Sequence, residues 1–79
     1  MLLTVYSREY CHLCHDMVAA LEAIQPRFGF QLEIVDVDED ESLETRYGEL
    51  VPVLVAAGEQ LCHYHLDLAA VEAYFAKCM

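Results

Sequence analysis

The chain has 79 residues, a length typical of one domain and too short for two, so we expect a single domain over residues 1–79. Hydrophobic residues make up 57% of the sequence, with only 3 Gly and 2 Pro, which excludes an intrinsically disordered or collagen-like chain. The formal net charge is -10, so we expect no nucleic-acid partner, because phosphate backbones need a basic surface.

The first residues carry no basic segment, and their apolar stretch is too short for a signal peptide. No window approaches the roughly 18 apolar residues that a membrane helix requires. We therefore expect a monomeric, cytoplasmic protein without a membrane partner. Structural disulfides are rare in that compartment, so the four cysteines need another explanation.

The first half of the chain predicts a strand, a helix and a second strand. Residues 2–6 form an apolar run with β-favouring side chains. Residues 12–25 have helical spacing of their apolar side chains, and Pro26 is expected to end the helix. Gly29 permits a turn into residues 30–37, where apolar and polar side chains alternate as in a strand.

The second half predicts a short acidic helix, a hairpin and a last helix. Residues 38–48 place acids in the first helical turn and a glycine at the end. Residues 51–56 and 60–65 read as strands joined by a tight turn at 57–59. A final helix, capped by Asp67, is expected to bury Leu68, Val71 and Phe75.

The resulting order is β-α-β-α-β-β-α. A strand–helix–strand unit implies a right-handed parallel crossover, and the short turn near the end implies an antiparallel hairpin. We therefore predict an α/β fold with a mixed four-stranded sheet.

A cysteine pair, Cys11-His12-Leu13-Cys14, lies at the junction between the first strand and the first helix. The two-residue spacer lets both sulfurs approach within disulfide reach, and the helix N-terminus favours a thiolate, which is the nucleophile in exchange. We expect Cys11 to be the attacking thiol and Cys14 the resolving thiol. His12, if protonated, would stabilise the Cys11 thiolate.

At this point the chain resembles a small glutaredoxin of the thioredoxin-fold superfamily, in particular short bacterial glutaredoxin-like proteins with a Cys-His-Leu-Cys site. The Cys11–Cys14 pair, Val51-Pro52 at the third strand, the element order and Arg8 carry the resemblance. It implies a three-layer fold with a cis Pro52 beside the cysteines. It also implies that the Val51 backbone pairs with substrate or glutathione, and that Arg8 contacts glutathione.

The chain also departs from the glutaredoxin pattern. Residues 63–67 contain no Gly-Gly pair, which in glutaredoxins helps to hold the γ-glutamyl group. Leu50 stands where the family has Thr, and His12 stands where Pro is common. A chain of charge -10 also repels a tripeptide anion. Disulfide chemistry is therefore better supported than glutathione specificity.

Three metal or haem motifs compete with this interpretation. Cys11-x-x-Cys14-His15 spells a haem attachment signal, but that chemistry belongs to exporting compartments. Zinc or an iron–sulfur cluster would need further convergent ligands from the distant 62–65 segment, so we expect no metal site. A calcium loop starting at Asp36 would lack its glycine and its last glutamate.

We therefore predict a thiol–disulfide oxidoreductase of cell redox homeostasis that acts through Cys11 and Cys14. It would need no cofactor, would act on a disulfide-containing protein or a glutathione adduct, and would be reduced by an external thiol, with glutathione a candidate. The alternative is a non-enzymatic metal or iron–sulfur carrier, or a partner-docking module. The expected substrate groove consists of Arg8, Tyr10, Leu13, Val51 and Pro52. Roles for Cys62, Cys78, His63 and His65 stay open, with Cys62 expected to be a small buried hydrophobe.

Overall fold

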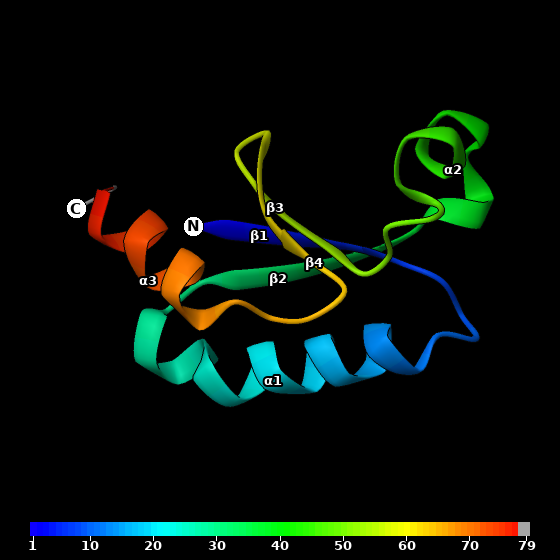
Figure 1. Cartoon of the computed structure of the whole chain (residues 1–79). Helices are drawn as coiled ribbons and strands as arrows, with labels where there is room; N and C mark the ends of the chain where they lie inside the picture. The colour runs from blue at the N-terminus through cyan, green and yellow to red at the C-terminus, as the bar shows by residue number, and fades with distance from the viewer. Residues whose placement is uncertain (78–79) are drawn as a thin grey trace.

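The computed structural model describes residues 1–77, and Figure 1 shows its elements in chain order. The predicted order β-α-β-α-β-β-α is confirmed, with one additional 3-10 turn, η1, between β2 and α2. The elements are β1 (Leu2–Ser7), α1 (His12–Phe28), β2 (Gln31–Asp36), η1 (Val37–Glu39), α2 (Glu41–Tyr47), β3 (Val53–Ala56), β4 (Glu59–His63) and α3 (Leu68–Lys77).

The four strands form one mixed sheet, as predicted, and their order in it is β2-β1-β3-β4. β1 pairs with β2 in parallel through the α1 crossover, whereas β1–β3 and β3–β4 pair antiparallel. β1 and β3 therefore occupy the centre of the sheet, and all four residues of β3 are buried. Such strands are covered on both faces, which explains their continuous apolar sequence.

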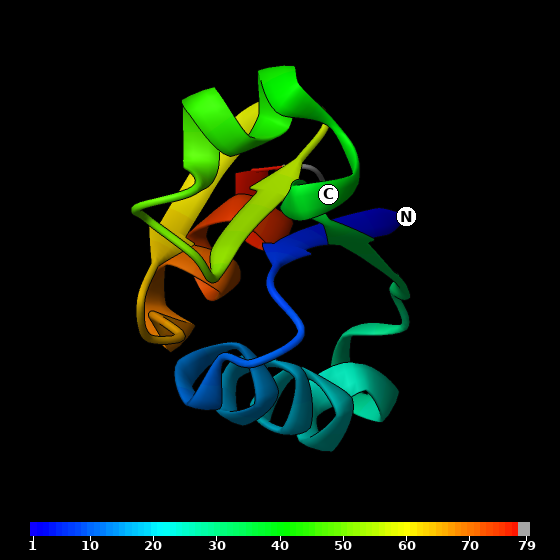
Figure 2. The ribbon, with the colours of Figure 1, turned by 90° about the vertical axis from the view of Figure 1, so that its right-hand side faces the viewer.

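Helices cover both faces of the sheet, which gives three layers. Figure 2 shows α1 below the sheet and α2 above it. On one face, Leu3, Val5 and Leu54 pack with residues of α1 and α3. On the other face, Val53 and Val55 pack with Val37 and with Tyr47 of α2. Alternate residues of β3 thus point into different cores, as the period of a strand requires.

The prediction that Pro26 ends the first helix is wrong, because α1 continues through it to Phe28. A proline inside a helix forfeits its own backbone hydrogen bond, and its ring crowds the carbonyl four residues earlier. Packing of the last turn on α3 compensates: Arg27 pairs with Glu72 at 2.7 Å, and the Phe28 ring stacks on Phe75 at 4.9 Å between centroids. Gly29 then ends the helix with a φ of 71°.

Two other expectations change at element ends. Leu68 is 39% exposed because it is the first residue of α3, whereas Val71 and Phe75 are buried as predicted. β4 ends at His63 rather than continuing to residue 65, since Tyr64 adopts a φ of 64°, which breaks the extended backbone. Separately, Ile34 is 54% exposed on the edge strand β2.

No helix within residues 1–77 combines the length and the apolar character needed to cross a bilayer.

Candidate active site

The strand register brings three separate segments to one end of the sheet. Tyr6, near the end of β1, pairs with Val53 at the start of β3, and Val53 in turn pairs with His63 at the end of β4. The cysteine segment after β1, the Val51–Pro52 segment before β3 and the residues after β4 therefore share this end. The Val51–Pro52 peptide bond is cis, and Pro52 is buried.

Cys11 and Cys14 form a disulfide with their Cα atoms 5.2 Å apart. Cys11 is the N-cap of α1, and its sulfur accepts a hydrogen bond of 3.1 Å from the backbone N–H of Cys14. Cys14 lies inside the first turn and is only 1% exposed, whereas Cys11 is partly exposed. An incoming disulfide can therefore reach Cys11 but not Cys14. The helix N-terminus would also favour a thiolate on Cys11.

The residues around Cys11 differ in exposure. Tyr10 is 96% exposed, and His12 is exposed on the first turn of α1. Leu13, predicted to line the groove, is half-buried. A pocket of about 290 Å³ lies beside Cys11 and is lined by Glu9, Tyr10, Cys11, His12 and His15.

Arg8, expected to contact glutathione, is held by acids of the α2 side. Its Nε lies 3.2 Å from Asp38 Oδ1 without hydrogen-bond geometry, and its Nη2 lies 3.7 Å from Glu44 Oε1. A Cβ on Gly48 would meet the Glu44 carbonyl oxygen and would lie 2.9 Å from Arg8 Nη2, so this approach requires glycine. The charge of Arg8 is therefore already balanced within the protein.

Sequence reasoning missed Tyr64, which braces the segment before β3. Its backbone N–H donates to the Pro52 carbonyl at 2.9 Å, and its hydroxyl donates to the Glu49 carbonyl at 3.0 Å. Tyr64 adopts a φ of 64°, in the left-handed region that a tyrosine rarely occupies. No sequence signal predicts this role, since Tyr64 stands between two histidines in a stretch without glycine.

Cys62 is a half-buried free thiol on β4. Burial raises the pKa of the Cys62 thiol, and the nearby Asp67 carboxylate raises it further, although a backbone hydrogen bond at Asp67 opposes the shift. Cys62 is therefore protonated near neutral pH and is a poor nucleophile. Cys78 lies outside the described residues.

Two histidines lie at the end of β4 and just after it. His63 and His65 are exposed, and the His63 ring contacts the Tyr64 ring edge-on. Across residues 1–77, no three or more His, Cys, Asp or Glu side chains come together in a group suited to a metal ion.

Comparison with known proteins gives a family and several related structures. A family model described as a glutaredoxin-like domain (DUF836) matches residues 2–76. Protein Ne2328 from Nitrosomonas europaea is 44% identical, with a TM-score of 0.84 over 91% of this chain and 87% of that chain. Protein XcR50 from X. campestris is 38% identical, with a TM-score of 0.75 over 95% of this chain and 96% of that chain. No curated protein matches.

A more distant relative carries a functional description. NrdH-redoxin from Escherichia coli, called a glutaredoxin-like protein with a thioredoxin-like activity profile, is 28% identical, with a TM-score of 0.62. That match covers 86% of this chain and 90% of NrdH-redoxin. Together with the Cys11–Cys14 pair, these similarities support a role in thiol redox chemistry. The chain belongs to the glutaredoxin-like domain family.

Proposed function

We propose that this protein is a thiol–disulfide oxidoreductase that uses Cys11 as nucleophile and Cys14 as resolving thiol. The Cys11 thiolate attacks one sulfur of a substrate disulfide, forms a mixed disulfide and releases the first substrate thiolate. The Cys14 thiol loses its proton to solvent and attacks the Cys11 sulfur, which releases the second substrate thiolate. The protein is left with the Cys11–Cys14 disulfide, and two electrons have passed to the substrate.

The observation that carries the proposal is the unequal exposure of two cysteines within disulfide distance. Cys11 caps α1 at the surface, whereas Cys14 is buried directly behind it. This arrangement separates the two roles, because only Cys11 meets a substrate and only Cys14 can reach the mixed disulfide from inside. The Tyr64 N–H bond to the Pro52 carbonyl holds the Val51–Pro52 segment, which we propose as part of the substrate site.

An external thiol completes the cycle by reducing the Cys11–Cys14 disulfide. We propose that glutathione is a weak reductant here, because Arg8 is occupied by Asp38 and Glu44. The thioredoxin-like activity profile attributed to NrdH-redoxin, a relative at 28% identity, supports a reductant other than glutathione. We further propose that the protein acts as a monomer in the cytoplasm, without a cofactor, in redox homeostasis.

A redox titration with mass mapping tests the proposal. The metal-free protein is equilibrated in defined thiol/disulfide buffers, alkylated and digested, so that the state of each cysteine is read separately. We expect a reversible Cys11–Cys14 disulfide with a potential of roughly -270 to -180 mV. Cys14→Ser should accumulate a stable mixed disulfide on Cys11, whereas Cys11→Ser should form none.

Two results would contradict the oxidoreductase. One is the absence of a reversible Cys11–Cys14 disulfide. The other is a coloured preparation, or one with stoichiometric zinc, in which bound metal protects both cysteines from alkylation. The metal or cluster carrier would then be the better assignment. Cys62→Ala is the control, and it should leave the Cys11–Cys14 titration unchanged.

A further inference from the structure

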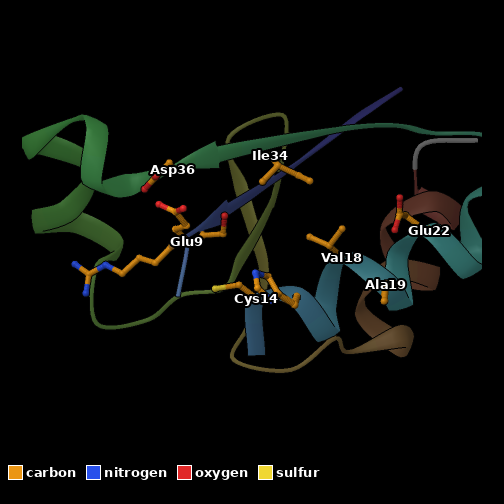
Figure 3. Close-up of a pocket in the computed structure, with 10 residues that line it drawn as sticks. Glu9, Cys14, Val18, Ala19, Glu22, Ile34 and Asp36 are labelled. Atoms are coloured by element: carbon orange, nitrogen blue, oxygen red, sulfur yellow. The ribbon is translucent and has the colours of Figure 1, made fainter. Parts of the chain in front are cut away.

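A groove that the proposed reaction does not use runs along α1 beside the cysteine pair. It has a volume of about 450 Å³ and lies between α1 and the end of the parallel β1–β2 pair. Figure 3 shows Val18 of α1 and Ile34 of β2 pointing toward each other across it, with Cys14 at one end and Glu22 at the other. The groove therefore begins at the buried Cys14 and leads away from it.

The dimensions of the groove suit an extended peptide. Residues 14 and 22 are eight positions apart on α1, which is about 12 Å at 1.5 Å per residue. A segment of about three or four extended residues spans that distance. Glu9 and His15 line both this groove and the pocket beside Cys11, so the two hollows are adjacent. A chain whose disulfide is attacked by Cys11 can thus continue into the groove.

The lining combines an apolar floor with an acidic rim. Val18, Ala19 and the exposed Ile34 supply apolar surface, whereas Glu9, Glu22 and Asp36 supply carboxylates. The one Lys or Arg among the lining residues is Arg8, whose guanidinium is engaged by Asp38 and Glu44.

Basic side chains elsewhere in the protein do little to offset the negative charge of this acidic rim. Arg27 and Lys77 are likewise paired with acids, and Arg46 lies over the Tyr47 ring. The potential at the groove is therefore negative, in keeping with a net charge of -10.

We propose that this groove binds the segment flanking the disulfide of a protein substrate, and that this segment carries Lys or Arg next to an apolar residue. The inference rests on the proposed oxidoreductase function and specifies its substrate class. The apolar residue covers Ile34 and Val18, while the basic side chain meets Glu22 or Asp36 at the rim. An anionic substrate such as glutathione disulfide is disfavoured by the same carboxylates.

The test compares three peptides that share one disulfide and differ only in the flanking residues, which are Lys-Leu, Ser-Leu or Glu-Leu. We expect kcat/KM for reduction to be about 10-fold higher for the Lys peptide than for the Glu peptide at 0.05 M salt. At 1 M salt the difference should nearly vanish, because charges are then screened over about 3 Å.

Two matched variants locate the effect. The double variant Glu22→Gln, Asp36→Asn should reduce the preference for the Lys peptide over the Glu peptide to about 2-fold. In the parent protein, Asp36 accepts a hydrogen bond from the backbone N–H of Asp38. The amide oxygen of an asparagine can accept the same bond. Glu39→Gln with Glu41→Gln removes the same charge from the α2 side and should retain the 10-fold preference. If both double variants lost the preference for the Lys peptide equally, the preference would arise from overall charge, and the proposal of a binding groove would be overturned.

The remaining outcomes separate the two proposals. If the unmodified protein reduces all three peptides at equal rates, the substrate class is wrong while the oxidoreductase stands. If it reduces none of them, the proposed function fails and the inference falls with it. A dimer in solution that Ile34→Lys dissociates would assign the groove to a second copy of the chain and would also overturn the proposal.

Discussion

The two sides of the cysteine pair are built differently. On the α2 side, Arg8 is paired with acids, Tyr47 stacks on Tyr6, and Tyr64 braces the segment before β3. On the α1–β2 side, carboxylates and an exposed Ile34 line an open groove. The α2 side therefore uses its polar groups in internal contacts that support the site. On the α1–β2 side, Asp36 accepts a bond from the Asp38 N–H, whereas the Glu22 carboxylate makes no hydrogen bond within residues 1–77 and can meet a partner.

The largest effect on stability is expected from Tyr47→Ala, on the α2 side of the cysteine pair. Tyr47 is buried between the sheet and α2, with its ring 4.4 Å from that of Tyr6. Removing a buried aromatic ring leaves a cavity, and we expect a loss of about 3 kcal/mol in the free energy of unfolding. Urea denaturation measures it. Tyr10→Ala, the same change at a fully exposed site, should alter stability by less than about 0.5 kcal/mol.

Tyr64→Phe tests the internal contacts of the α2 side, because it removes one of the two hydrogen bonds by which Tyr64 holds the segment before β3. The variant loses the hydroxyl bond to the Glu49 carbonyl, and we expect about 1 kcal/mol of lost stability. The backbone bond from Tyr64 to Pro52 stays, but its amide should exchange faster with deuterium. KM for a peptide disulfide should rise because Pro52 is held less firmly. Unchanged amide exchange and KM would show that the hydroxyl does not brace this segment.

Removing the acidic partners of Arg8 should change the rate of reaction with glutathione disulfide more than it changes the free energy of unfolding. Asp38→Asn with Glu44→Gln removes both acid partners, and exposed ion pairs contribute at most about 1 kcal/mol. We expect the rate with glutathione disulfide to rise about 3-fold or more, because a cation becomes available to the tripeptide anion. The control is Glu39→Gln with Glu41→Gln, which has the same net charge and leaves Arg8 paired. An equal rise in the control would refute a specific role for Arg8.

The smallest effect concerns the pH dependence that arises from Cys62. Its pKa is raised above the ordinary value by burial, so the folded state holds the thiol proton more tightly than the unfolded state does. This contribution to stability is fully present below the ordinary pKa of a thiol and is lost as the pH rises through the higher folded pKa. We expect Cys62→Ala to lose less stability than the parent as the pH rises above the ordinary thiol pKa of about 8.5. Parallel stability curves would contradict the raised pKa.

Local patterns were sufficient to predict most of the fold. Apolar runs identified β1 and β3, helical spacing identified α1, and the turn residues before β4 identified the hairpin. The position of Cys11 and Cys14 at a strand–helix junction was also readable, because it depends only on neighbouring residues. These features follow from backbone periodicity and turn chemistry, which act over a few residues.

Contacts between segments far apart in the chain could not be predicted from the sequence. Pro26 stays within α1 because Arg27 and Phe28 pack on α3, and Glu72 lies 45 residues after Arg27 in the chain. Arg8 turns toward Asp38 and Glu44, and Tyr64 reaches back to Glu49, through pairings that no local pattern encodes. The groove likewise requires α1 and β2 to lie side by side.

The sequence by itself therefore determined most of the elements, their order and the place of the Cys11–Cys14 pair at a strand–helix junction. Only the tertiary structure decided which charges near that pair are already paired and which face an open groove. The physical reason is that side-chain partners depend on sheet register and helix packing, which join residues far apart in the chain.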